Sequence, residues 1–473
     1  MSAIAGDAPE PAAGVAAGEA VPAVTGSPGD VVGRIERLPL SRWHVRIRTI
    51  VGIATFFDGF DALMIGYVLT VLVPQWHLTG PEIGLIVSAG FAGQLGAALV
   101  FGALAERFGR IRILTIATGL FGLMSCLCAM AWDYDSLLVF RTVQGFGLGA
   151  EVPIAMTYIS ELAKAENRGR FVVLYELAFP IGLVASVLIG WFVVPVLGWR
   201  WLFVFGGVPA VIVAGMQLGL PESPRWLAAR GRYADADRSL SLIEGAVARS
   251  TGRSLPSAAP GRTGPARQAS VADLFGPLYL PRTLSVWAMW FATYLLNYSM
   301  ATWLPTLYRS LFHFSVSAAL GYSLVTSAVG LLGTAACAFI FDVLSRRLVV
   351  CAAFVGAGLP PLWLWHHGIT SAALLLAMAT TSYFFVSVLS MGTFVYTPEI
   401  YSNRVRAMGM TVAGCWSRSA AIIGPLVIGA LIGSSGGVAP AFMIFGVVAL
   451  LAALLSARFV VETRGRTFEE ISP

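Results

Sequence analysis

Four acidic and two basic residues lie inside long apolar stretches of this 473-residue chain. A charged side chain in such a stretch is costly, so it is kept where it has a partner or a task. Because the acids outnumber the bases, one or two carboxyl groups should be protonated in some state, which favours a proton-driven process. The histidines lie at or outside the ends of these stretches, so no histidine proton relay is expected. The six residues are Asp58, Asp61, Arg141, Glu151, Glu176 and Arg418.

Asp58 and Asp61 are three positions apart, so a helix would place them on one face. At about 1.5 Å per residue they lie roughly 12–17 Å into the apolar helix that we expect there. Burial favours the neutral form of a carboxyl group, so a proton can bind during a transport cycle. We predict proton coupling for both residues and substrate contact for Asp61. A structural hydrogen bond to a backbone or hydroxyl group is the alternative.

Arg418 lies near the middle of another apolar stretch, between small residues and Trp416. Its planar guanidinium stays charged and matches a carboxylate, so it can hold an anionic substrate. A permanent ion pair with Asp58 or Asp61 is the alternative. Four aromatic residues on neighbouring stretches could enclose a flat ring, although packing explains most aromatics in membrane helices. They are Tyr298, Trp303, Tyr383 and Tyr396.

Arg141 and Glu151 share one apolar stretch but are ten positions apart, or about 15 Å on a helix, so they should not pair directly. Each therefore needs its own partner. We predict a gating role for Arg141 and proton coupling for Glu151 and Glu176. Fixed ion pairs that hold helices in register are the alternative for all three.

Charged motifs next to the apolar stretches occur twice along the chain. GALAERFGR is echoed by AFIFDVLSRR, and YISELAKAENRGR by YTPEIYSNRVRAMG. The separation is 236 positions from Glu106 to Asp342 and 238 positions from Glu161 to Glu399. Equal spacing at separate sites indicates duplication of one unit. We predict that the charged residues of these motifs form ion pairs that gate the cytoplasmic side. The alternative is that they only fix the orientation of the helices in the membrane. The residues are Glu106, Arg107, Arg110, Glu161, Arg168, Asp342, Arg346, Glu399 and Arg406.

The composition is that of a polytopic membrane protein. Hydrophobic residues make up 57% of the chain, charged residues only 12%, and the mean hydropathy is +0.77. Soluble proteins have roughly 25% charged residues. The net charge of +6 reflects arginines between apolar stretches, as the positive-inside rule requires, so we expect no nucleic-acid partner. The cysteines lie in apolar stretches and should be free thiols.

Twelve membrane-spanning helices are predicted, in two pseudo-symmetric halves of six with both termini in the cytoplasm. Residues 1–49 form an N-terminal tail, disordered at first and then basic and amphipathic. The first half is 50–220, the cytoplasmic linker 221–282, the second half 283–460 and the C-terminal tail 461–473. The spans are expected near 50–72, 83–105, 113–132, 137–160, 171–192, 200–220, 283–306, 317–341, 348–366, 372–398, 408–432 and 439–460.

Several of these motifs resemble those of major facilitator superfamily transporters. GALAERFGR is similar to the GxLADRxGR-type loop, with Glu106 where aspartate is usual. RxxQGxGxGxE runs from Arg141 to Glu151, and PESPRWL occupies Pro221 to Leu227. The resemblance covers nearly the whole chain after residue 34 and implies an all-α membrane protein with the major facilitator fold.

Three further segments are most similar to the bacterial niacin-uptake branch: FFDGFD, YISELAKAENRGRFVVLYELAF and WSRSAAIIGPLVIG. Aromatic-acid proton symporters share the DGFD pattern from Asp58 to Asp61. The resemblance implies proton-coupled import of a small aromatic or heteroaromatic monocarboxylate by alternating access, with nicotinate favoured and benzoate-type acids as the alternative. A sugar is less favoured because residues 294–305 read YLLNYSMATWLP and lack the QQxxGxN pattern of sugar porters. A drug efflux substrate is also less favoured.

No set of nucleophile, base and orienting group is evident, and no metal-spaced cluster or phosphate-binding loop, so the sequence disfavours an enzyme. A substrate sensor would need a soluble output domain, which the linker is too short to provide. We expect no cofactor and no metal. The expected partners are an organic acid, protons and the bilayer of a bacterial-type cytoplasmic membrane, with the protein a monomer.

Overall fold

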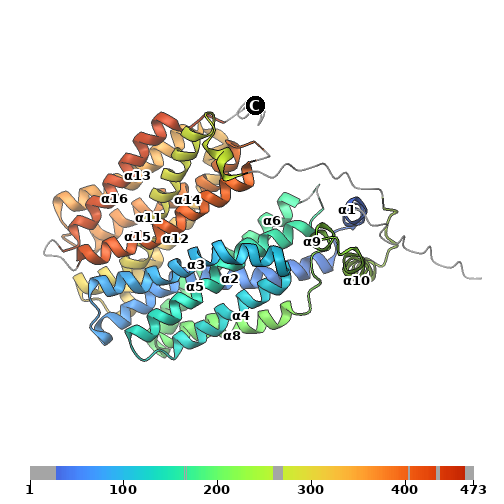
Figure 1. Ribbon diagram of the computed structural model, residues 1–473. Helices are drawn as coiled ribbons and strands as arrows, with labels where there is room; N and C mark the ends of the chain where they lie inside the picture. The colour runs from blue at the N-terminus through green and yellow to red at the C-terminus, as the bar shows by residue number, and fades with distance from the viewer. Residues whose placement is uncertain are drawn as a thin grey trace, which may run out of the picture.

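Two bundles of long helices make up the computed structural model (Figure 1). The structure describes residues 28–164, 166, 168–258, 270–402, 405–432 and 437–463. The N-terminal half contains α2 (Arg42–Trp76), α3 (Gly80–Phe108), α4 (Arg110–Ala129), α5 (Tyr134–Leu162), α6 (Arg168–Glu176), α7 (Ala178–Leu197) and α8 (Arg200–Gln217). The C-terminal half contains α11 (Leu280–Phe312), α12 (Val316–Val343), α13 (Arg346–His367), α14 (Ala372–Glu399), α15 (Arg406–Ile432) and α16 (Ala439–Phe459).

Helices cover all the predicted spans, but not all of them are apolar enough to be assigned to a membrane by composition. Among the described residues, nine helices are long and apolar enough to cross a bilayer, and ten if the bent α3 counts as one span. α3 bends by 42° between Gly80–Ala98 and Val100–Phe108. α5 and α11 fall short because their sequences contain charged and polar residues such as Arg141 and Asn297. The total of twelve spans therefore stays a prediction.

The segment before the first span departs from expectation. We predicted disorder up to residue 33, and residues 1–27 lie outside the described residues. Pro28–Glu36, however, form α1, whose Val31 and Ile35 are buried against Trp226 and Leu240. The Ala, Gly and Pro content of the preceding tail hid this short amphipathic pattern.

Helices also fill much of the predicted linker, as α9 (Pro224–Ala229), α10 (Tyr233–Thr251) and the 3₁₀ helix η2 (Val271–Phe275). The Arg34 guanidinium joins α1 to α10 through ion pairs of 2.7 Å with Glu244 and 2.6 Å with Asp237. The side chains of Ile243 and Val247 pack in the same core as Val51 of α2. α9 and α10 therefore belong to the N-terminal half, whereas η2 packs against α11 of the C-terminal half, where Thr283 Oγ1 donates to the Leu274 carbonyl.

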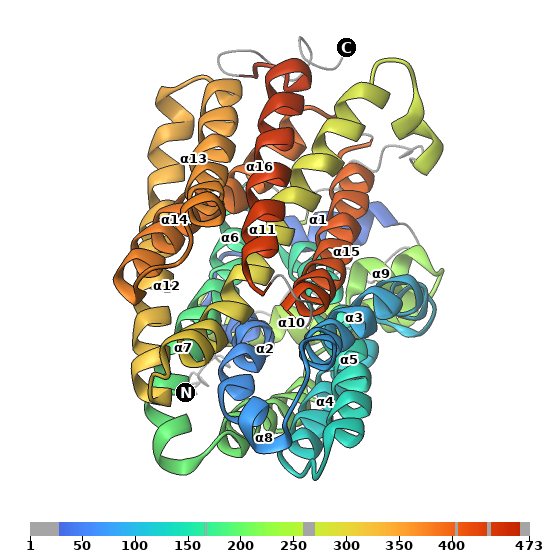
Figure 2. The ribbon, with the colours of Figure 1, turned by 90° about the vertical axis from the view of Figure 1, so that its left-hand side faces the viewer.

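The two halves meet at the helix ends opposite α9 and α10, and their ribbons diverge toward α9 and α10 (Figure 1). Figure 2, which looks at that closed end, shows α15 beside α3 and α12 beside α7. Ser88 Oγ donates to the Ile422 carbonyl at 2.7 Å, and Trp191 Nε1 donates to the Ser317 carbonyl at 3.1 Å. A Cβ atom on Gly84 would lie 2.7 Å from the Pro425 carbonyl oxygen, so α3 and α15 are in close backbone contact.

Candidate functional site

Asp61 and Arg141 form a buried ion pair between α2 and α5. Arg141 Nη1 lies 2.8 Å from Asp61 Oδ2 and 3.0 Å from Oδ1. Gln144 Nε2 donates to Asp61 Oδ1 at 2.9 Å, and Gln144 Oε1 accepts from Arg141 at 2.8 Å. Arg141 and Gln144 both donate to Asp61, so in this conformation Asp61 has protein partners. The sequence had placed Asp61 at the substrate and Arg141 at the gate; the structure brings them together inside the N-terminal half.

Glu151 lies farther along α5 in a separate polar group. Its Oε1 accepts a hydrogen bond of 3.0 Å from Thr55 Oγ1, and the Thr55 hydroxyl lies 2.6 Å from the Tyr175 hydroxyl. Glu176 follows Tyr175 at the end of α6, and its Oε1 is buried without a partner in the part of the chain that the structure describes. As predicted, Arg141 and Glu151 do not pair with each other; their partners are Asp61 and Thr55.

Arg418 differs from Arg141 because it has no ion-pair partner among the described residues. Its Nη1 donates to the Gly414 carbonyl of its own helix at 3.4 Å, and its buried Nε has no partner there. Asp58 of the N-terminal half interacts electrostatically with Arg418 and with Tyr298 of the C-terminal half. The permanent ion pair with Asp58 or Asp61, which was the alternative for Arg418, is absent from this conformation of the described chain.

Two tyrosines of α11, Tyr294 and Tyr298, interact electrostatically with Arg418. The Tyr298 ring lies 4.6 Å from the Phe91 ring and 5.8 Å from the Tyr294 ring between centroids, so rings of both halves meet there. Trp416, two residues before Arg418, packs against Trp287 at 5.5 Å, and side chains two positions apart on a helix do not face each other. The tyrosines of α11 are therefore the aromatic residues that the structure brings to the region of Arg418.

The other predicted aromatic residues divide into two groups. Tyr383 is buried, and its ring packs against Gly330 and interacts electrostatically with Tyr298. Trp303 instead lines an apolar seam with Ile428 and Phe442 between α11, α15 and α16. The Tyr396 hydroxyl accepts from the Val461 amide at 2.8 Å, at the far end of α14. The structure therefore does not bring Trp303 and Tyr396 to Arg418, and we withdraw them from the candidate substrate site.

The predicted gating residues of the N-terminal half form a network at the start of α4. Arg110 Nη2 lies 2.8 Å from Glu106 and 3.4 Å from Glu161. Glu222 of the PESPR motif accepts from the backbone amides of Arg110 and Ile111 at 2.9 and 3.2 Å. A carboxylate at these amides satisfies the helix N-terminus and its dipole.

The C-terminal half repeats this arrangement at the start of α13. Arg346 Nη2 lies 3.1 Å from Glu399, and the Arg346 amide donates to Glu462 at 3.1 Å. Ser345 also donates to Glu462. Glu222 and Glu462 were missed in the sequence, although they are 240 positions apart in the similar strings PES and VET, which continues the repeat.

Two further predicted gating residues contact a backbone carbonyl and an aromatic ring. Arg406 Nε donates to the Pro398 carbonyl at 2.9 Å, and the Arg107 guanidinium lies 5.3 Å from the centre of the Phe108 ring. The side chains of Arg168 and Asp342 lie outside the described residues. Each ion pair of the two networks joins residues of one half, so they stabilise the helix ends within each half in this conformation.

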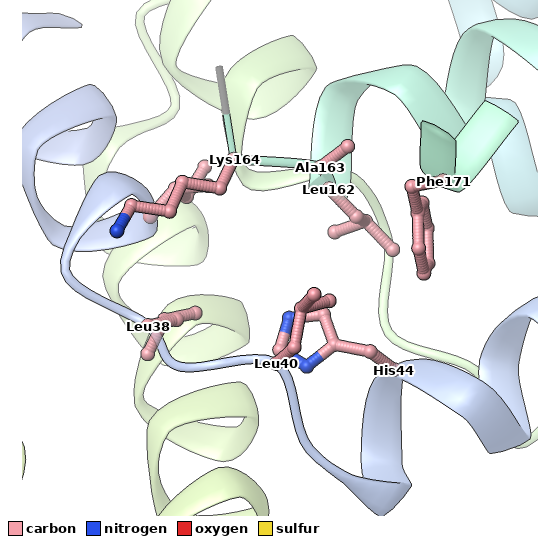
Figure 3. A pocket seen from close by; sticks show the side chains of 8 residues that line it. Leu38, Leu40, His44, Leu162, Ala163, Lys164 and Phe171 are labelled. Carbon is pink, nitrogen blue, oxygen red and sulfur yellow. The ribbon is translucent and has the colours of Figure 1, made fainter. Parts of the chain in front are cut away.

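A small pocket between the N-terminal segment and the end of α5 is not a substrate site. Figure 3 shows its lining, with His44 near Phe171 and Leu162, and with the Lys164 amine directed away from it. The His44 ring lies 6.3 Å from the Phe171 ring, and its Nδ1 lies 3.1 Å from Ser41 Oγ. The lining is mainly apolar and contains no residue of the Arg418 region.

The two pseudo-symmetric helical bundles and the buried charges at their boundary define a transporter of the major facilitator type. A family model described as "Sugar (and other) transporter" matches residues 48–473, and the chain belongs to that family. It is a multi-pass membrane transporter and not an enzyme.

Relatives and solved structures agree with this assignment. The chain is 32% identical to the niacin transporter NiaP of Acinetobacter baylyi, over 93% of this chain and 99% of the relative. It is 29% identical to a gallate transporter of Pseudomonas putida, over 90% of this chain and 94% of the relative. The fold matches a crystal structure of a D-xylose-proton symporter with a TM-score of 0.70 at 20% identity, over 90% of this chain and all of that chain.

Proposed function

We propose that the protein is a proton-coupled importer of a small aromatic or heteroaromatic monocarboxylate in the bacterial cytoplasmic membrane, with nicotinate as the favoured substrate. The observation that carries this proposal is Arg418, a cation within electrostatic reach of Tyr294 and Tyr298 and with no ion-pair partner among the described residues. A carboxylate would supply the missing partner, and Tyr298 and Tyr383 would contact the ring of the substrate. The similarity to the niacin and gallate transporters supports an aromatic acid.

Proton coupling is inferred from the excess of buried acids. Asp61 is neutralised by Arg141, so Asp58, Glu151 and Glu176 remain without an ion-pair partner among the described residues. Burying several uncompensated carboxylates is unfavourable, so protons are expected on some of them. Exchange of these protons with the two sides of the membrane would couple uptake to the proton gradient.

Uptake into proteoliposomes tests the proposal. We expect an inward proton gradient to drive accumulation of labelled nicotinate, and a protonophore to abolish that accumulation while exchange continues. No gradient-stimulated uptake of either nicotinate or benzoate would contradict the proposal.

The second candidate is a benzoate-type aromatic acid, favoured by the gallate transporter among the relatives. Uptake of labelled nicotinate in the presence of unlabelled benzoate, and the reverse, shows which of the two acids the protein prefers. Xylose serves as the neutral comparison because it has no carboxylate for Arg418, and we expect no competition from it.

A further inference from the structure

Glu151 is the most completely buried carboxyl group of the N-terminal half. None of its side chain is exposed, and no cation pairs with it among the described residues. Its Oε1 accepts from Thr55, and its Oε2 is buried without a partner among the described residues. An ionised carboxylate in this place would exchange its hydration for one hydrogen bond to a neutral hydroxyl, which is strongly unfavourable. These surroundings favour the neutral form of Glu151 in this conformation.

The groups around Glu151 reinforce this conclusion. The titratable residues that face it are Asp58 on α2 and Tyr175 and Glu176 on α6, and none of them can carry a positive charge. α3 and α4 also pack on α5, but their arginines and glutamates lie at helix ends. These are Glu82, Glu106 and Arg107 on α3, and Arg110 and Arg112 on α4.

Thr55 determines which oxygen of Glu151 holds the proton. A threonine hydroxyl has one hydrogen. When Thr55 donates it to Oε1 of Glu151, the Tyr175 hydroxyl donates to Thr55, and the acidic proton of Glu151 is left on Oε2. The chain from Tyr175 through Thr55 to Glu151 thus joins α6, α2 and α5 and orients the carboxyl group.

We propose that Glu151 holds the transported proton and that Thr55 and Tyr175 are the residues that position its carboxyl group. This inference rests on the proposed proton coupling and assigns the proton to one residue. Release breaks the O–H bond at Oε2 and passes the proton to water, and the negative charge stays on Glu151. The Thr55 hydrogen bond then stabilises that charge, so its loss should impair proton release more than substrate exchange.

The experiment compares two transport modes in proteoliposomes, using whichever of nicotinate and benzoate the wild type accumulates. Counterflow exchanges substrate without net proton movement, whereas accumulation requires proton release. We expect Thr55→Val to lower gradient-driven accumulation at least tenfold and to leave counterflow within twofold of wild type. Tyr175→Phe should lower accumulation several-fold, because Thr55 loses its donor. Thr55→Ser keeps the hydroxyl and should stay within twofold of wild type in both modes.

Thr118→Val is the matched control. Thr118 is also a fully buried threonine of the N-terminal half, and its Oγ1 has no partner among the described residues. We expect this variant to match wild type in both modes. An equal loss of accumulation and counterflow in Thr55→Val, or no loss in either, would overturn the positioning role.

Infrared spectroscopy tests the protonated acid independently of transport. The wild type should show a carbonyl band of a protonated carboxyl group that is absent from Glu151→Gln. If that band persists in Glu151→Gln, Glu151 does not hold the proton, whatever the liposomes show. A wild type that exchanges substrate but never accumulates it would overturn the coupling itself, and this inference with it.

Discussion

Two arginines of the bundle differ in how their charge is balanced. Arg141 has a carboxylate at 2.8 Å and an amide oxygen at the same distance, whereas Arg418 donates one long hydrogen bond to a backbone carbonyl. A guanidinium with an ion-pair partner is costly to separate from it. This difference is why we propose Arg418, and not Arg141, as the residue that binds an incoming anion.

Replacement of Arg418 should separate anionic from neutral ligands. We expect Arg418→Gln to weaken nicotinate binding at least tenfold, since a charged hydrogen-bonded pair contributes roughly 1.5–3 kcal/mol. Arg418→Lys should recover only part of the affinity because it lacks the planar fork. Isothermal titration with nicotinate and with neutral nicotinamide measures this difference. Equal nicotinate affinity in wild type and Arg418→Gln would show that another residue binds the acid.

Replacement of Asp61, the ion-pair partner of Arg141, should lower the stability of the protein and not its affinity for the substrate. Asp61→Asn leaves a buried guanidinium without its counter-ion, so we expect a loss of roughly 3–5 kcal/mol in stability. Asp61→Asn should spare substrate binding, because Arg418 is the proposed partner of the acid. The double replacement Asp61→Asn with Arg141→Gln should regain most of the thermal stability. Melting temperatures in detergent and a double-mutant cycle measure the coupling. Additive losses would mean that the two side chains act independently.

At the scale of the elements, α4 and α13 begin in the same way. The amides of Arg110 and Ile111, which follow Gly109, donate to Glu222, and the amide of Arg346 donates to Glu462. Gly109 has a φ of 113°, a conformation that favours glycine, which lets the chain turn sharply between α3 and α4. The duplicated unit thus includes the acid after its last helix, so each half brings its own cap to the turn before α4 or before α13.

Sequence patterns predicted the positions of the helices well, because apolar length is a local property of the chain. The spacing of Arg141 and Glu151 on one helix also predicted correctly that they do not pair with each other. The partner of Arg141 was not predictable in this way, since it depends on how α2 and α5 are rotated against each other 80 positions apart. The same reason explains why Tyr396 and Trp303 were assigned to the wrong surroundings.

At the scale of the whole molecule, the halves contact each other on one side and diverge on the other. α3 and α15 make that contact through glycines, and a methyl group on Gly84 would come within 2.7 Å of the Pro425 carbonyl oxygen and 3.1 Å of Leu426 Cα. Backbone atoms cannot move aside as a flexible side chain can. The closed side of the transporter therefore depends on the absence of a side chain at residue 84.

Gly84→Ala should shift the alternating-access equilibrium toward the conformation that opens this side. Overpacking costs typically about 1–3 kcal/mol, so the population of the opened state should rise at least about fivefold. Hydrogen–deuterium exchange of the amides in 80–90 and 420–430 measures the opening. Gly102→Ala is the matched control, because a Cβ atom on Gly102 of the same helix meets nothing within 4 Å. Faster exchange in Gly84→Ala alone would support close glycine packing as the element that holds this side shut, whereas equal exchange in both variants would contradict it.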